Sequence, residues 1–271
     1  MSYQNASDSI QWSIIVPVHN EAARILPHLR SIASYMQDLG QPYEVLVVDD
    51  GSTDATASIV ETVASTVPEI QLIRAPLRRG KGAAVRRGMQ AAVGRLQLFT
   101  DADGAIPIQE LARPEEAMAN EADVAIGSRS LASRLPDYAV QARWYRIILS
   151  SLFNSLIQQR GLRGITDSQC GFKLFRQTVA VDLFGVSSID GYGFDLELLY
   201  VAQQRGYRIA EIPVNWSHQP GSKFRVLRDG FAMLRELAVI RRNRTKGYYA
   251  APLHPRNFHP APVSQIGLPP Q

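Results

Sequence analysis

The chain has 271 residues, 45% of them hydrophobic and 20% charged, which suffices for one large α/β domain whose core needs no covalent staples. Its single cysteine, Cys170, excludes an intrachain disulfide, and no uninterrupted apolar run approaches the about 20 residues of a membrane-spanning helix. The net charge of +4 is uneven, because seven Arg and Lys side chains lie between residues 225 and 246.

This basic stretch fits either a solvated helix face or contact with an anionic surface. The sequence shows none of the aromatic-interleaved or zinc-type motifs of nucleic-acid-binding proteins, so we expect no nucleic-acid partner. Residues 1–11 are polar and lack the basic-then-apolar pattern of a signal peptide. We therefore expect a disordered N-terminus and a cytoplasmic protein, either soluble or peripheral on the inner face of the membrane.

Strand and helix patterns alternate along the first half of the chain. The β-rich apolar runs predict strands at residues 13–18, 44–48, 70–74, 95–100 and 124–127. Helices are predicted between them, beginning at Glu21 behind an Asn20 cap, near Asp54, and after the basic glycine loop 78–82. This alternation favours right-handed crossovers and a mostly parallel sheet flanked by helices.

The pattern changes in the second half. It predicts amphipathic helices at 143–159 and 226–242, a helix at 195–204, and strands at the end of 167–175 and at 207–214. Both amphipathic helices combine apolar and basic residues, which suits either packing on the core or binding at a membrane interface. The expected organisation is a domain over 12–225, a basic helix over 226–249 and a Pro-rich disordered tail over 250–271.

Two carboxylates follow the central predicted strand, and the rest of the chain is organised around them. Asp101 and Asp103 come directly after the apolar run that ends at Thr100. Open parallel sheets bind ligands at this carboxyl end, and paired carboxylates suit a hard divalent cation such as Mg²⁺ or Mn²⁺. An ordinary acidic turn after a strand would show the same residues.

Other polar residues fall at equivalent places. Asp49 and Asp50 end the second strand, where they could bind a nucleoside or simply form a strand-to-helix turn. Lys81 lies between two glycines, so its loop could approach a phosphate or be a plain basic turn. Because parallel strands bring these ends to one rim, we expect one shared site there. Its members would be Asp49, Asp50, Lys81, Asp101, Asp103 and Arg129.

Several motifs, in this order, resemble those of the family 2 inverting glycosyltransferases of GT-A (Rossmann-like) fold. They are Ile14–Glu21, Val47–Asp54, Arg79–Gly82, Thr100–Gly104 and Gly127–Arg129. Later segments resemble the dolichyl-phosphate β-glucosyltransferases within that family. These are Asp167–Phe175, Phe194–Tyr200, Glu211–Trp216 and Gly221–Lys223.

The resemblance implies a nucleotide-sugar site, a metal site and an acceptor site. Asp101 and Asp103 would hold Mg²⁺ or Mn²⁺ against the diphosphate, and water or phosphate would complete the shell because residues 104–107 offer no side-chain oxygen. Arg129, Arg146 and Ser150 would hold the acceptor phosphate. The nucleotide sugar would contact Pro17, His19, Asn20, Glu21, Asp49, Asp50, Lys81, Asp101 and Ala102.

The acceptor decides whether a general base is needed. A sugar hydroxyl needs a carboxylate within hydrogen-bond reach, whereas a phosphate monoester is already anionic. Asp167, Asp195 and Glu197 are the available carboxylates, and we favour Asp167 near the reacting centre and Asp195 as an acceptor-side or structural group. Cys170 is expected to be a buried packing residue, and His19 the only histidine near the rim.

These observations favour a metal-dependent inverting transferase that moves glucose from UDP-glucose onto a polyprenyl or dolichyl-type lipid phosphate. The alternative keeps the chemistry but uses a soluble sugar or a small phosphorylated acceptor. A nucleotidyltransferase is disfavoured, because it would usually carry a glycine-rich basic first loop where this chain has Val18-His19-Asn20-Glu21. A non-catalytic nucleotide-sugar binder is the remaining possibility.

Overall fold

The computed structural model describes residues 10–140, 162, 164–219 and 226–250. The helix predicted at 143–159, with Arg146 and Ser150, and the termini predicted to be disordered lie mainly outside these residues. The strands are β1 (Trp12–Val18), β2 (Tyr43–Asp50), β3 (Ile70–Ala75), β4 (Leu96–Thr100), β5 (Val124–Ser128), β6 (Phe172–Arg176) and β7 (Ile209–Pro213). The α-helices are α1 (Ile25–Leu39), α2 (Thr56–Ala64), α3 (Lys81–Ala91), α4 (Ala112–Ala119), α5 (Arg129–Ala132), α7 (Gln177–Val186), α8 (Phe194–Gln204) and α9 (Val226–Thr245), and a 3₁₀ helix, η2, spans Ile108–Leu111.

One sheet runs through the domain in the strand order β3-β2-β1-β4-β6-β5-β7. The prediction of a mostly parallel sheet is confirmed, since only β6 runs antiparallel to its neighbours β4 and β5. Every residue of β1, β2 and β4 is buried, as expected for central parallel strands covered on both faces.

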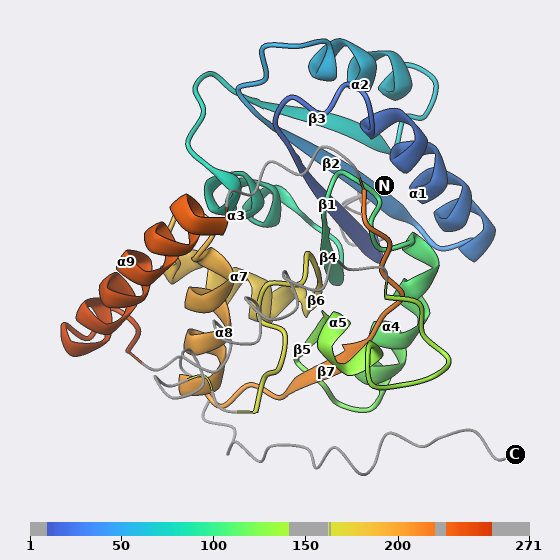
Figure 1. Ribbon diagram of the computed structural model, residues 1–271. Coiled ribbons are helices and arrows are strands. Elements are labelled where there is room, and N and C mark those ends of the chain that lie inside the picture. The colour runs from blue at the N-terminus through green and yellow to red at the C-terminus, as the bar shows by residue number, and fades with distance from the viewer. Residues whose placement is uncertain (1–9, 141–161, 163, 220–225, 251–271) are drawn as a thin grey trace, which may run out of the picture.

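Helices cover both faces of the sheet (Figure 1). On one face α1, α2, η2 and α4 share a core with alternate strand residues such as Ile14 and Val45. On the other face α3, α7, α8 and α9 share a second core with the intervening strand residues, such as Ile15 and Leu46. This alternation of side chains along each strand divides the apolar residues into two cores.

The structure corrects several predicted boundaries. The helix expected from Glu21 begins at Ile25, and Asn20 is not its cap, because Asn20 has a φ of 54° and bonds to another loop. The strand expected over 44–48 extends from Tyr43 to Asp50, so that Asp49 and Asp50 are its last two residues. The helices α4 and α7 had no counterpart in the prediction, whereas α8, β7 and α9 agree with it within three residues.

The strand order reverses between β2-β1 and β4, so the carboxyl ends of β1 and β4 flank a topological switch point. The loops after β1, β2, β3 and β4 all emerge at this edge, as the sequence predicts. Within the described part of the chain, no helix is both long and apolar enough to cross a bilayer.

Candidate active site

The loops after β1 and β2 are locked together by side-chain hydrogen bonds. Asn20 Oδ1 accepts from the backbone N–H of Thr53 at 2.7 Å, and the Asn20 N–H donates to Ser52 Oγ at 2.8 Å. His19 Nδ1 lies 3.0 Å from the backbone oxygen of Asp50. The first loop therefore has a fixed position beside the second, and Pro17, at the end of β1, pairs with Val48 of β2.

Glu21 and Asp49 also brace these loops. The Glu21 N–H donates to Thr56 Oγ1 at 2.7 Å, and its carboxylate accepts from Arg24 Nε at 2.9 Å. Asp49 Oδ1 accepts from the Ser52 N–H at 2.9 Å, which is the hydrogen bond of a tight acidic turn. The structure thus gives Asp49 a local structural contact at the rim.

Asp50 joins β2 to the loop before α3. Its Oδ1 accepts from the Arg79 N–H and its Oδ2 from the Gly80 N–H, both at 2.8 Å. Only 5% of Asp50 is exposed, so these two backbone donors compensate the buried charge. A cavity of about 160 Å³ lies beside it, between the ends of β2 and β3 and helix α3, and Arg86 and Arg87 contribute to its lining.

Lys81 reaches from the start of α3 to the end of β4. Its Nζ lies 2.5 Å from Asp101 Oδ1 and 5.2 Å from the centroid of the Phe99 ring. Burial opposes the charged form, but Asp101 and Asp195 outweigh it and raise the pKa of Lys81. The loop before α3 and the carboxylates after β4 therefore meet, as the sequence predicts.

Gly171, just before β6, leaves room for the Asp101 side chain. The Asp101 N–H donates to the oxygen of Gly171 at 3.1 Å, and a Cβ added at Gly171 would lie 2.0 Å from Asp101 Oδ2. A glycine is thus required where the antiparallel strand begins. Ala102, between the two carboxylates, is buried.

The donor set at Asp101 and Asp103 suits a hard divalent ion. Burial and the neighbouring Asp101 raise the pKa of Asp103, so a cation at this place would relieve the repulsion between the two carboxylates. Arg24 NH1 is 3.8 Å from Asp103 Oδ2. The described residues contain no group of three His, Cys, Asp or Glu side chains that could hold a metal ion, so further ligands would have to come from water or substrate oxygens.

A second ion pair, which is buried, lies near these groups. Lys173 of β6 is fully buried, and its Nζ donates to Asp195 Oδ1 and to the oxygen of Cys170, both at 2.6 Å. Burial, only partly offset by Lys173 and Lys81, raises the pKa of Asp195. Negative and positive side chains thus alternate in the order Asp101, Lys81, Asp195 and Lys173. Asp195 is the buried carboxylate that interacts with both lysines.

Arg129 and Asp167 form a two-point ion pair. Arg129 Nε and NH2 each lie 2.8 Å from a different oxygen of Asp167, and the Arg129 N–H donates to the same carboxylate at 3.0 Å. Burial alone would raise the pKa of Asp167, but Arg129 outweighs it and the pKa is lowered. Asp167 is therefore an anion that orients Arg129, and Glu211 in turn accepts from the Asp167 N–H at 2.8 Å.

Arg129 and Asp101 line the same small pocket. Its volume of about 20 Å³ has room for about one water molecule, and Cys170, Gly171 and Trp216 complete one side. Burial and the nearby Asp167 raise the pKa of the Cys170 thiol to about 12, so this residue is a neutral packing group, as expected. The pocket brings the predicted metal ligand and the predicted acceptor-binding arginine to one place.

The expectation that His19 is the only histidine near the rim is wrong. His28 of α1 lies against the loop after β4, since a Cβ added at Gly104 would be 3.2 Å from His28 Nδ1. His28 is buried, and its Nε2 has no hydrogen-bond partner among the described residues. The only sign of its burial in the sequence is its spacing from Ile25, Leu29 and Ile32, which places it on the same buried face of the helix.

We expect His28 to make the folded state sensitive to acid. Burial lowers the pKa of His28 from 6.5 to about 4, so below pH 6.5 the unfolded chain takes up a proton that the folded chain refuses. The stabilisation is complete above pH 6.5 and is lost towards pH 4, by about 3 kcal/mol in total. Urea titrations at pH 7 and pH 5 should show a steeper loss of stability in the wild type than in His28→Leu. Equal losses in the two proteins would contradict the assignment.

The sequence matches the model of glycosyl transferase family 2 over residues 13–184. The dolichyl-phosphate beta-glucosyltransferase of Dictyostelium discoideum is 36% identical over 251 residues, which cover 88% of this chain and 76% of the relative. The corresponding protein of Homo sapiens is 33% identical over 248 residues, covering 87% of this chain and 76% of the relative.

Solved structures share the fold. The glucosyl-3-phosphoglycerate synthase of Mycobacterium tuberculosis, crystallised with Mn²⁺, uridine diphosphate and glucosyl-3-phosphoglycerate, superposes with a TM-score of 0.61 at 21% identity, covering 91% of this chain and 82% of the other. The mannosyl-3-phosphoglycerate synthase of Rubrobacter xylanophilus gives a TM-score of 0.62 at 19% identity, with 88% and 76% coverage. The GT-A fold implied by the sequence motifs is thereby confirmed.

Proposed function

Because the chain belongs to glycosyl transferase family 2 and is therefore a glycosyltransferase, we propose that it transfers glucose from UDP-glucose to a polyprenyl or dolichyl-type lipid phosphate. The relatives at 32–38% identity carry the name of that activity and span most of this chain, which supports the glucosyl donor and the lipid acceptor. We further propose inversion at the sugar carbon and dependence on Mg²⁺ or Mn²⁺.

One observation carries this proposal: Asp101 and Arg129 line one pocket. Asp101 stands on the side of the nucleotide loops, next to Lys81, while Arg129 begins the short helix after β5. A guanidinium there would bind oxygens of an acceptor phosphate two at a time. The donor and the acceptor would then meet within a few ångströms, as direct displacement requires.

The donor would occupy the rim formed by the first two loops. Asp50 would accept a hydrogen bond from the nucleoside, while Pro17, His19, Asn20 and Glu21 would line that end. Lys81 would exchange part of its contact with Asp101 for the diphosphate. Asp101 and Asp103 would hold the divalent ion, whose positive charge supplies stabilisation of the departing diphosphate.

The state of the carboxylates supports a phosphate acceptor. An acceptor phosphate oxygen would attack the sugar carbon while the bond to the diphosphate breaks, and no proton has to be removed from an anionic nucleophile. Asp167 has both oxygens bonded to Arg129, and Asp195 is bonded to Lys173. Both therefore fit roles in positioning charged neighbours better than the role of a general base.

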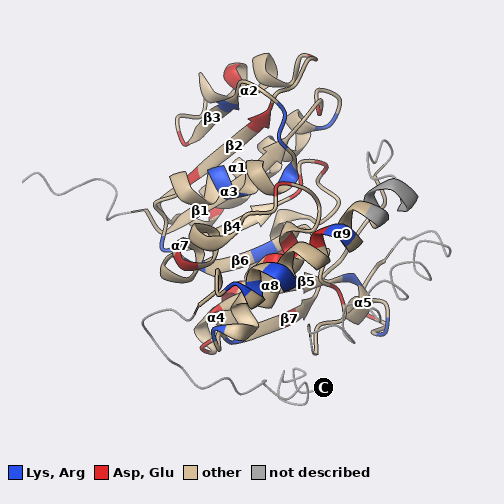
Figure 2. Cartoon of the chain, turned by 90° about the vertical axis from the view of Figure 1, so that its left-hand side faces the viewer, with Lys and Arg blue, Asp and Glu red and all other residues tan. Residues whose placement is uncertain are grey.

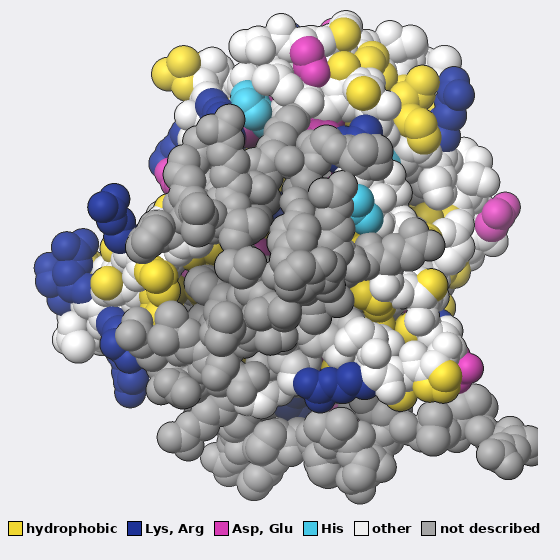
Figure 3. All heavy atoms as spheres, in the orientation of Figure 1, with side chains coloured by type: hydrophobic (Ala, Val, Ile, Leu, Met, Phe, Trp, Pro, Cys, Tyr) yellow, Lys and Arg dark blue, Asp and Glu magenta, His cyan; other side chains and the backbone are white. Residues whose placement is uncertain are grey.

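Helix α9 supports contact with an anionic membrane surface, in a different way from the sequence expectation. Its apolar side, with Met233, Leu237 and Ile240, is buried against the core and is not available to lipid. The exposed side carries the basic residues, which gather at the left edge of Figure 3 and appear as blue segments in Figure 2. These are Arg235, Arg241, Arg242 and Arg244 of α9, together with Lys246 just after it. Attraction to anionic headgroups would be worth about 1 kcal/mol per basic side chain.

Purified protein with radiolabelled UDP-glucose, Mn²⁺ and a short polyprenyl phosphate is expected to produce a labelled lipid that contains glucose. GDP-mannose and UDP-N-acetylglucosamine are the comparison donors, and 3-phosphoglycerate is the soluble comparison acceptor. Labelling of the soluble acceptor alone, together with no flotation on anionic vesicles, would favour the alternative acceptor class. Absence of transfer from every donor to either acceptor would overturn the proposal.

A further inference from the structure

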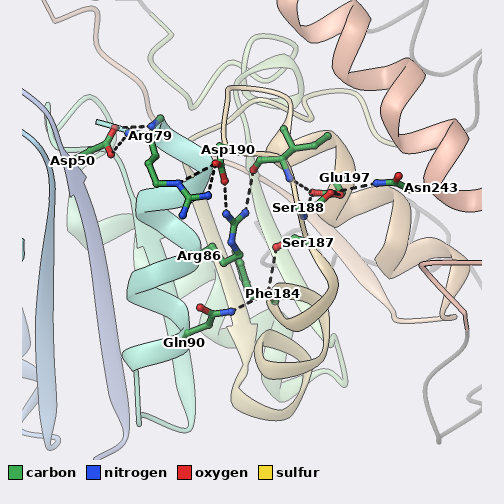
Figure 4. A network of polar contacts seen from close by, with 12 residues as sticks. Asp50, Arg79, Arg86, Gln90, Phe184, Ser187, Ser188, Asp190, Glu197 and Asn243 are labelled. Carbon is green, nitrogen blue, oxygen red and sulfur yellow. Dashed lines mark hydrogen bonds and ion pairs between the residues drawn. The ribbon is translucent and has the colours of Figure 1, made fainter. Parts of the chain in front are cut away.

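The segment between α7 and α8, residues 187–193, lies directly against the loop that opens α3. The carboxylate of Asp190 accepts hydrogen bonds from Arg79 Nε at 3.2 Å and Arg79 NH2 at 2.8 Å, and it also pairs with Arg86 (Figure 4). The backbone oxygen of Asp190 accepts from the N–H groups of Gly82 at 2.8 Å and Ala83 at 3.3 Å. Asp190 thus holds both the side chains and the backbone of this loop.

Gly80 and Gly82 allow the loop to approach residues 189 and 190 this closely. A Cβ on Gly80 would lie 2.4 Å from the Asp190 oxygen, and a Cβ on Gly82 would lie 2.5 Å from the Ile189 oxygen. Gly80 also has a φ of 127°, which side chains rarely adopt. The sequence fits either close approach of these glycines to a phosphate or a plain basic turn, and the structure adds that they allow close approach of another segment of the chain.

The loop held by Asp190 also contacts the carboxylates of the proposed nucleotide-sugar site. The N–H groups of Arg79 and Gly80 compensate the Asp50 carboxylate, and Lys81 pairs with Asp101. A shift of this loop would therefore disturb Asp50 and Asp101 together, although Asp190 itself is bonded to neither.

Both ends of the segment are held by side chains of α8 and α9. Glu197 of α8 accepts from the N–H groups of Ser188 at 2.8 Å and Ile189 at 2.9 Å. Glu236 of α9 accepts from the Gly193 N–H at 2.7 Å. Asn243, also on α9, donates to Ser188 Oγ at 3.3 Å. Figure 4 shows the continuous line of contacts from Asp50 to Asn243.

We propose that Asp190 is a positioning residue for donor binding, and that α9 keeps it in place through Glu236 and Asn243. The inference rests on the proposed nucleotide-sugar site, because it names what holds that site in shape. It also connects α9 to the loop that opens α3 through the hydrogen bonds of residues 187–193. Loosening α9 should therefore weaken binding of the nucleotide, although neither Glu236 nor Asn243 is bonded to Asp50.

The test uses the full chain with Asp190→Asn and, for α9, Glu236→Ala. The control is Glu121→Gln, which removes a carboxylate from the exposed ion pair with Arg208. Isothermal titration with UDP and Mn²⁺ should give a dissociation constant raised about tenfold by Asp190→Asn and about threefold by Glu236→Ala, with no change in the control. The KM for the donor should rise more than kcat falls, and the melting temperature should stay close to that of the control.

A second readout does not depend on any ligand. In the free protein, the amides of residues 79–83 should exchange hydrogen about tenfold faster in Asp190→Asn than in the wild type or the control. If the wild type binds no UDP, the proposed donor is wrong, but the exchange rates still decide whether Asp190 holds the loop. Unchanged exchange at residues 79–83, or unchanged UDP affinity in a wild-type protein that binds UDP, would overturn the inference.

Discussion

Replacing Asp103 with alanine is expected to lower kcat at least about 1000-fold, because it removes one of the two side chains that would hold the metal ion. Burial and the neighbouring Asp101 raise the pKa of Asp103, because both disfavour the anionic carboxylate. A divalent ion would convert this repulsion into attraction and would place positive charge where the diphosphate departs.

The measurement is steady-state transfer from UDP-glucose at saturating Mn²⁺, together with Mn²⁺ binding followed by electron paramagnetic resonance. Asp38→Ala is the matched control, since Asp38 is an exposed aspartate at the C-terminal end of α1, away from Asp103. The variant should lose both activity and metal affinity while the control keeps both. Full turnover by Asp103→Ala would remove the basis for the metal assignment.

Replacing Lys173 with methionine is expected to cost about 3–5 kcal/mol of folding stability, because it leaves the buried carboxylate of Asp195 without its partner. Lys173 is 0% exposed and Asp195 is 2% exposed, so water cannot take over the lost contact. Burial already raises the pKa of Asp195, and without Lys173 the side chain would be protonated more readily.

Urea denaturation at pH 7 measures this cost. The double variant Lys173→Met with Asp195→Leu should recover most of the lost stability, since both charges are then replaced by apolar groups of similar size. Arg208→Met, which breaks the exposed pair with Glu121, should cost less than about 1 kcal/mol. A Lys173→Met protein as stable as the Arg208 variant would show that the buried pair does not hold β6 and α8 together.

The predicted site residues are brought together where the described structure contains them. The sequence placed Asp50, Lys81, Asp101 and Arg129 after strands or at helix openings, and a parallel sheet brings such positions to one edge. The structure adds the contacts between them, such as the Lys81–Asp101 pair at 2.5 Å. It also shows that Asp49 accepts a hydrogen bond within a turn. A turn was one of the two roles that the sequence allowed for Asp49 and Asp50, the other being nucleoside binding.

The helices that the sequence did not predict have weak local signals. Helix α7 begins immediately after β6 and is rich in valine, which has only a modest preference for helices. Helix α4 is short and carries Pro114 in its first turn. Both are helical because their apolar residues pack on the sheet, and such packing cannot be read from a short window of sequence.

The sequence by itself determined the α/β class, the central buried strands, the edge that carries the site and the family. Those properties follow from local patterns: apolar runs, the residues at strand ends and motifs in a fixed order. Only the tertiary structure decided the positions of His28, Gly171 and Asp190. Gly171 meets Asp101 because β6 runs antiparallel beside β4, with Phe172 opposite Thr100. Asp190 meets Arg79 across 111 residues of chain, and no local pattern encodes a contact between residues so far apart.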